Sequence, residues 1–168
     1  MNNSIFSNSI RFIGLVLLQV LILNHINLFG YLNPMVYIVW VFLFPIKKEK
    51  GFFLIASFLL GLSIDIFSDS GGINAAATLF IAFVRLPILK TVLRKSDFDY
   101  FLFNLRDISI DKIFIYIATL TIIHHFIVFF LEYFSITDLI TVISNTFFTS
   151  LFTIIVSILG ILLFVKKK

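Results

Sequence analysis

Hydrophilic breaks interrupt this chain at intervals, and the positive charge in them alternates between abundant and absent. Six apolar stretches, which we expect to be helices, run over residues 10–29, 32–46, 51–67, 73–92, 113–134 and 139–165. Lysine and arginine gather near the N-terminus, after the second stretch, between the fourth and fifth, and at the C-terminus. The other breaks hold none, and of the 13 cations only Arg85 lies in the interior of a stretch. Because positive loops orient membrane helices toward the cytoplasm, the pattern predicts six spans with both termini cytoplasmic.

Composition agrees with a protein that lies almost entirely in lipid. The chain is 60% hydrophobic and only 13% charged, against about 25% charged in soluble domains. Its net charge of +4 does not require nucleic acid, because the cations sit at helix ends, where anionic headgroups account for them. With no cysteine there is no disulfide framework and no thiolate site. We therefore expect an all-α integral membrane protein, a single domain over residues 1–168, with membrane lipids and no nucleic acid as partners.

Two parts of this layout are unusual. The second stretch is short for a span, which needs about 20 residues, and we expect Asn33 to cap it, Pro34 to take its first turn and Pro45 to end it. Such a span must be shielded by neighbouring helices or lie where the bilayer thins. The cytoplasmic loop over residues 93–112 interleaves aromatic residues with both signs of charge. That mixture fits either a segment lying in the membrane interface or a partly ordered loop.

The third stretch carries a row of small and polar residues. Ser57, Gly61 and Asp65 are four residues apart and therefore share one helix face. Small residues there allow another backbone to approach closely, and Asp65 is expected near the outer end. The row is either a packing ridge or a site for partner binding or substrate gating.

The fourth stretch begins with paired glycines and contains the exceptional arginine. Gly72 and its neighbour allow a tight turn, and Asn74 is expected to cap the helix. Arg85 is expected to snorkel toward the cytoplasmic end, or else to serve a function there. Pro87 frees a carbonyl in the preceding turn, which a kink would expose to a partner.

Polar residues also lie in the last two stretches. His125 and Glu132 are seven apart and share a face, whereas His124 points away, so the two histidines cannot ligate one metal. No metal site is expected; His125 should hydrogen-bond between helices, and Glu132 should lie near the outer interface. The sixth stretch carries a row of polar residues four apart, expected to pack on a neighbouring helix: Thr141, Asn145, Thr149, Thr153 and Ser157.

A family resemblance rests on these same regions. The residues that carry it are Gly61, Asp65-Ile66-Phe67-Ser68, Gly72, Asn74-Ala75-Ala76-Ala77-Thr78, Phe83-Val84-Arg85, Pro87, His124-His125-Phe126, Phe130-Leu131-Glu132 and Asn145-Thr146-Phe147-Phe148-Thr149. Together they resemble the MreD family of bacterial rod shape-determining membrane proteins. Asn74 stands where a histidine is common, and Leu86 intervenes between Arg85 and Pro87. The resemblance covers roughly residues 51–165, and it singles out Gly61, Asp65, Gly72, Arg85 and Pro87.

The resemblance implies a fold and a function. The family is similar in architecture to the six-helix substrate-binding subunits of energy-coupling-factor vitamin transporters. Its members act without catalysis and without a cofactor in the inner-membrane complex that elongates the cell. Their partners there are the single-span protein MreC, MreB filaments, the RodA glycosyltransferase and its transpeptidase. The chain is thus expected to be a membrane adaptor between filaments and peptidoglycan synthesis.

Two other classes of function compete with the adaptor. A substrate-binding subunit of a vitamin-type transporter would enclose a polar pocket open to the outer face, where Asp65, Asn74 and Glu132 are expected. An intramembrane enzyme needs a nucleophile with a base, or a metal, and the sequence holds no recognisable arrangement of either kind. We therefore do not expect an enzyme.

Overall fold

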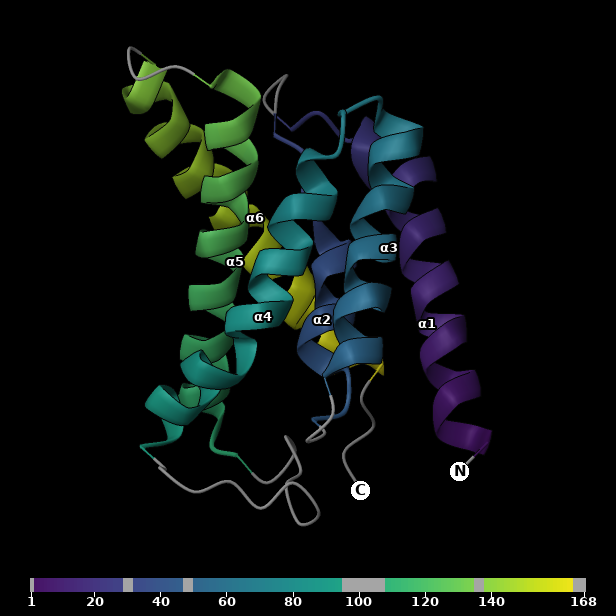
Figure 1. Cartoon of the computed structure of the whole chain (residues 1–168). Helices are drawn as coiled ribbons and strands as arrows, with labels where there is room; N and C mark the ends of the chain where they lie inside the picture. Colours follow the sequence, from purple (N-terminus) through teal and green to yellow (C-terminus); the bar gives the residue numbers. More distant parts are fainter. Residues whose placement is uncertain (1, 29–31, 47–49, 95–107, 135–137, 165–168) are drawn as a thin grey trace.

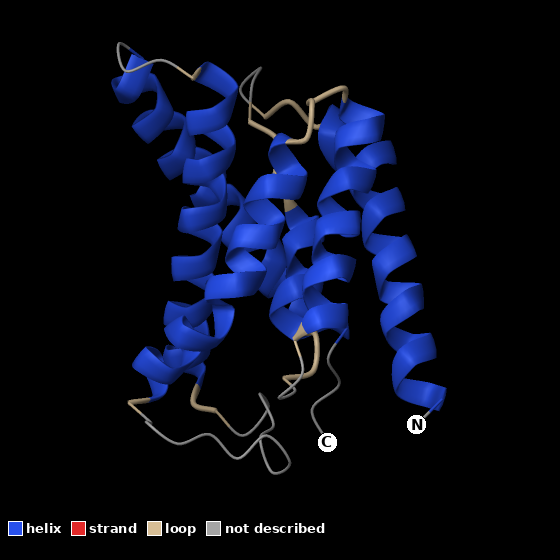
Figure 2. Ribbon diagram, viewed as in Figure 1, coloured by secondary structure: helices blue, strands red, loops and turns tan. Residues whose placement is uncertain are grey.

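The fold is a bundle of membrane-spanning helices. The computed structural model describes residues 2–28, 32–46, 50–94, 108–134 and 138–164. Within these ranges, five helical stretches are long and apolar enough to cross a membrane, namely Phe6–His25, Gly51–Ser68, Ile73–Leu93, Ile110–Tyr133 and Leu139–Gly160. The described part of the chain consists of helices with turns and loops (Figure 2), and of one isolated bridge between Leu28 and Leu32. The expected all-α, multi-pass membrane protein is confirmed.

Six α-helices follow one another along the described chain. They are α1 (Asn2–Leu21), α2 (Val39–Leu43), α3 (Gly51–Ser68), α4 (Ile73–Leu93), α5 (Ile110–Tyr133) and α6 (Leu139–Phe164), with 3-10 turns at Leu23–His25 and Val36–Ile38. The predicted third, fourth and sixth stretches agree with α3, α4 and α6 to within one residue. Helix α5 begins three residues earlier than predicted, because Ser109 takes the position before it and accepts the first N–H bond, from Ile113.

Helix α1 differs more from its predicted range of 10–29. It begins at Asn2 and ends at Leu21, before the 3-10 turn Leu23–His25. An apolar stretch marks only the part of a helix that can lie in hydrocarbon. Polar residues such as Asn8 extend the helix beyond that part without interrupting its hydrogen bonds.

The second predicted helix is wrong over half its length. Residues 32–35 are non-helical, and helical structure is limited to the 3-10 turn Val36–Ile38 and the five residues of α2. Asn33 does not cap it: its side chain instead bonds Asn27, accepting from the Asn27 N–H at 2.7 Å. Asn33 lies outside the helix because a residue before proline is driven out of the α region, and Pro34 also precedes the first helical residue, Val36. Pro45 does follow the end of α2, as predicted.

The short α2 segment nevertheless lies at the centre of the bundle. Tyr37, Ile38, Val41 and Phe42 are each at most 1% exposed. Figure 1 shows α2 between α3 and α4, with α6 behind it. A helix this short cannot reach across the hydrocarbon by itself, and protein shields it on its sides, as the sequence argument requires.

The two ends of the bundle differ in character. Helices α3 to α6 are consecutive antiparallel neighbours, and α1 runs beside α3 in the same direction (Figure 1). The α3–α4 turn lies at one end, which we call the turn end. The opposite end, where α3 and α5 begin and α4 ends, we call the basic end because it carries Lys50, Lys90, Arg94 and Lys112. The basic end is the one that the charge pattern predicts to be cytoplasmic.

Candidate functional site

The α3–α4 hairpin closes through direct backbone contact at Gly61. A Cβ atom at Gly61 would lie 2.6 Å from the Cα of Ala75, and nearer still to the carbonyl oxygen of Asn74. Any larger residue at position 61 must therefore push α3 and α4 apart. Ser57, one turn earlier, is fully buried and donates its hydroxyl to the Phe53 carbonyl of its own helix at 2.7 Å. Gly61 of the predicted row therefore lies against α4, and Ser57 is buried one turn earlier.

Asp65 is the end cap of the neighbouring helix. Its Oδ1 accepts from the Asn74 N–H at 2.9 Å and its Oδ2 from the Ala75 N–H at 2.8 Å. These N–H groups belong to the first turn of α4, which has no intrahelical partners for them. The Ser70 hydroxyl also donates to Oδ1, at 2.6 Å. A carboxylate at the positive end of a helix dipole is favourable, so Asp65 joins the two helices rather than facing outward.

Asn74 was expected to cap α4, and that expectation is wrong. Gly72 precedes the helix with a φ of 94°, a conformation that suits glycine, and Asn74 is the second residue of the helix, within its first turn. The Asn74 side chain instead continues the network. Its Nδ2 donates to Asp65 Oδ1 at 3.1 Å and to Ser70 Oγ at 3.0 Å. Since a carboxylate only accepts, the amide oxygen of Asn74 must point the other way, into the bundle.

A buried hydrogen-bond chain runs from that amide oxygen to the fifth helix. The Tyr37 hydroxyl donates to Asn74 Oδ1 at 2.8 Å, and His124 Nε2 lies 3.0 Å from the same hydroxyl. Because Tyr37 has a single O–H hydrogen, His124 must donate to it, which places the imidazole hydrogen on Nε2. Asn74, Tyr37 and His124 are all buried. His124 Nδ1 is then left bare, and it has no partner among the described residues.

His125 starts a second chain between α5 and α6. Its Nδ1 lies 2.9 Å from the Thr121 carbonyl, so this nitrogen carries the hydrogen. Its Nε2 accepts from the Thr153 hydroxyl at 3.0 Å, and Thr153 Oγ1 accepts from the Met35 N–H at 3.0 Å. The chain therefore ties α5, α6 and the segment before α2 together.

Gln19 holds the same segment from the other side. Its Oε1 accepts from the N–H groups of Val36 and Tyr37 at 2.8 and 3.3 Å, and its Nε2 donates to the Pro34 carbonyl at 2.9 Å. The first N–H groups of a helix need acceptors, and here a residue of α1 supplies them. Gln19 is the residue that caps the 3-10 turn Val36–Ile38 before α2.

The buried face of α6 is rotated from the predicted one. Thr149, Thr153 and Ser157 are buried as part of the predicted row, but Thr141 is exposed. Asn145 lies at the edge of the helix and donates to the Tyr133 hydroxyl at 3.0 Å. Thr146 and Ser150 are buried in their place. The row drifts because 3.6 residues per turn carries an i, i+4 series around the helix.

Arg85 reaches across the basic half of the bundle. It is 3% exposed, its Nη1 donates to the Val41 carbonyl at the end of α2, and its guanidinium carbon lies 4.2 Å from the centre of the Phe53 ring. Pro87 is exposed, and α4 continues past it to Leu93. Glu132 is exposed at the turn end of α5. Arg85, Pro87 and Glu132 thus stand apart from the Asp65 network.

The structure therefore gathers some of the predicted residues and separates others. Gly61, Asp65, Gly72 and Asn74 meet at the α3–α4 turn. No group of three or more His, Cys, Asp or Glu residues in the described ranges could hold a metal ion. No family model, curated protein or solved structure matches this chain.

Three central residues escaped the sequence reasoning, namely Gln19, Tyr37 and His124. Gln19 carried a signal, since it is a polar residue inside an apolar stretch and membranes make such residues costly. His124 was noted but assigned away from the polar face. Tyr37 had no signal, because tyrosine is common in membrane helices near their ends.

Proposed function

We propose that this chain is a non-catalytic membrane adaptor of the bacterial cell-elongation complex, held in the inner membrane. Its partners would be an MreC-type single-span protein, MreB-type filaments, and a RodA-type glycosyltransferase with its transpeptidase. The resemblance to the MreD family supplies these identities. The supporting structural observation is the state of Asp65.

Asp65 is the buried carboxylate that a solute-binding subunit would offer to its ligand. Both of its oxygens are instead occupied by groups of the α3–α4 hairpin. The next polar groups inward, Asn74 and Tyr37, are also bonded within the chain. Polar groups that bind a solute must exchange their hydrogen bonds for the ligand, at a cost for each group left unpaired. A site whose Asp65, Asn74 and Tyr37 groups are already bonded to one another and to the hairpin suits a rigid scaffold that presents its outer faces to other membrane proteins.

The test is depletion of the chain in a rod-shaped bacterium that encodes it, scored for cell width and growth. We expect rounding that a plasmid copy of the chain reverses and that nutrient supplementation does not. Growth arrest of cells that stay rod-shaped, relieved by a vitamin mixture, would instead favour the transporter subunit. Depletion with neither effect contradicts both.

A second measurement tests the adaptor role directly. The tagged chain, solubilised in mild detergent, is expected to retain the MreC-type protein of the same cell. An unrelated single-span protein of similar abundance is the control. Equal recovery of the two proteins would remove the partner from the proposal.

A further inference from the structure

The guanidinium of Arg85 is buried, and the described residues accept little of its hydrogen-bonding capacity. Among the described residues it makes one hydrogen bond, to the Val41 carbonyl, and one contact with the face of Phe53. An arginine has five N–H donors and no acceptor. Charged groups inside a membrane are costly and are normally paired with one another or with backbone carbonyls. Among the described residues, no carboxylate contacts the guanidinium of Arg85.

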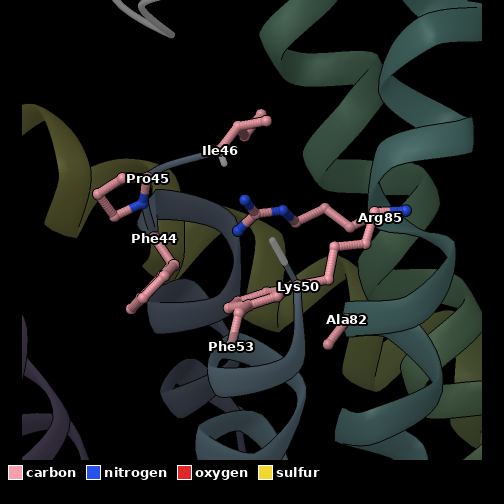
Figure 3. A pocket seen from close by; sticks show the side chains of 7 residues that line it. All are labelled: Phe44, Pro45, Ile46, Lys50, Phe53, Ala82 and Arg85. Carbon is pink, nitrogen blue, oxygen red and sulfur yellow. The ribbon is translucent and has the colours of Figure 1, made fainter. Parts of the chain in front are cut away.

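The guanidinium of Arg85 faces a hollow at the basic end. Figure 3 shows the Arg85 side chain extending from α4 toward Pro45 and Ile46, above the Phe53 ring. The hollow has a volume of about 20 Å³, enough for one or two atoms of a ligand or a water molecule. Five apolar side chains line it, together with the cations Lys50 and Arg85: Phe44, Pro45, Ile46, Phe53 and Ala82.

The hollow is open to a partner from outside the bundle. Lys50 is exposed, stands directly before the first residue of α3 and is one of the residues that line the hollow. Helix α4 continues for eight residues after Arg85, about 12 Å, before it ends at Leu93. Arg85 therefore lies about 12 Å from the end of the helix. A phosphate oxygen of a lipid headgroup, or a dissolved anion, can reach that depth by entering beside Lys50. Basic pockets between membrane helices are typical sites for anionic headgroups.

The chemistry of the two cations selects the ligand. A guanidinium presents parallel N–H groups that match two oxygens of a phosphate, whereas an ammonium acts as a point charge. An oxygen that enters an apolar-walled hollow is partly withdrawn from water, which strengthens its attraction to a buried cation. A carboxylate ligand is less suited, because it has only two oxygens. If both bind Arg85, none is left to contact Lys50.

We propose that Arg85 and Lys50 form a binding site for a phosphate group at the basic end of the bundle. One or two phosphate oxygens occupy the hollow against Arg85, and the remaining oxygens stay near Lys50. The phosphate comes either from the headgroup of an anionic phospholipid or from free phosphate. This site does not depend on the proposed adaptor function.

The test uses the full chain purified in detergent. In the lipid arm, native mass spectrometry measures retention of phosphatidylglycerol against phosphatidylcholine with the same acyl chains. In the phosphate arm, thermal unfolding is measured in lipid-free detergent with millimolar inorganic phosphate, and with sulfate-free chloride at the same ionic strength. Wild type is compared with Arg85→Gln, Lys50→Gln and Arg94→Gln, the last being an exposed cation of the same end that lies outside the hollow.

A headgroup site predicts that wild type prefers phosphatidylglycerol by about tenfold, as expected for one charge-assisted contact. Arg85→Gln should abolish the preference, Lys50→Gln should reduce it several-fold, and Arg94→Gln should leave it unchanged. A free-phosphate site predicts instead that phosphate raises the unfolding temperature of wild type and Arg94→Gln but not of Arg85→Gln.

Equal retention of both lipids by wild type, with no effect of phosphate, would overturn the proposal. So would equal losses in Lys50→Gln and Arg94→Gln, because the preference would then be due to surface charge in general. If Arg85→Gln does not fold, the comparison of Lys50→Gln with Arg94→Gln decides alone.

Discussion

Two charged side chains are buried at opposite ends of this bundle, and the chain treats them differently. Asp65, at the turn end, is 4% exposed and has both oxygens bonded to the first turn of α4 and its flanking serine. Arg85, toward the basic end, is 3% exposed and, among the described residues, bonds a single carbonyl. The cost of burying a charge is met inside the protein in the first case. In the second case the described residues supply one carbonyl and the face of one aromatic ring, and this is the charge for which we propose a ligand.

The largest effect should come from filling the contact beneath the Asp65 cap. Gly61→Leu places a side chain where the backbone of Ala75 already lies, so α3 and α4 must separate and the Asp65 bonds must lengthen. We expect a loss of at least about 3 kcal/mol, the upper range for overpacking, or no folded protein. Thermal unfolding in detergent measures it. Gly14→Leu is the matched control, because nothing lies within 4 Å of a Cβ there; similar losses in both variants would contradict the close contact.

The next effect should come from removing the carboxylate. Asp65→Ala leaves the buried N–H groups of Asn74 and Ala75 without acceptors, at about 1–3 kcal/mol for each unsatisfied group. Asp65→Asn keeps one acceptor and should lose less. The exposed Asp69→Asn is the control, with little change expected. If Asp65→Ala unfolds at the wild-type temperature, Asp65 is not the cap of α4.

Two buried tyrosines test whether the hydrogen bonds between Asn74, Tyr37 and His124 stabilise the fold. Tyr37→Phe removes the hydroxyl between Asn74 and His124 and should cost roughly 1 kcal/mol. Tyr116 is also buried, but its hydroxyl has no partner among the described residues. Removing an unpaired buried hydroxyl should be neutral or stabilising. Chemical or thermal unfolding should thus separate Tyr37→Phe from Tyr116→Phe, and equal losses would mean that the chain of bonds contributes nothing.

The smallest effect on stability is expected from replacing Arg85. Arg85→Leu loses one hydrogen bond and the contact with Phe53, but it also removes a desolvated charge, so the change in lipid-free detergent should be under about 1 kcal/mol. Thermal unfolding beside Asp65→Ala checks the contrast. A loss from Arg85→Leu as large as that from Asp65→Ala would show that the two ends are equivalent after all.

The bundle was largely predictable, and the main exception, the segment before α2, depends on a contact between residues distant in sequence. Apolar length and charge alternation determine where α3, α4 and α6 begin and end, since those signals are local. Residues 32–35 were predicted as helix because Asn33 and Pro34 have the chemistry of a helix start. The acceptors for that start come instead from Gln19, in another helix, and no local pattern reveals such a contact.

The candidate site shows the same division. The row of Ser57, Gly61 and Asp65 could be assigned to one face from spacing alone. That Asp65 would cap α4 could not, because it depends on the geometry of the turn between the helices, where Gly71 and Gly72 take positive φ values. The link from Asn74 through Tyr37 to His124 joins three helical segments that are distant in sequence, and was not foreseen.

The segment between α1 and α3 has a consequence for how the protein is made. Its Met35 N–H donates to the Thr153 hydroxyl of α6, which is synthesised 118 residues later. Until then, a stretch with only a few helical residues has neither the length to cross the bilayer nor its final neighbours. The segment before α2 can therefore reach its final hydrogen bonding only after α6 has been made, so its packing cannot be completed when α1 and α3 insert.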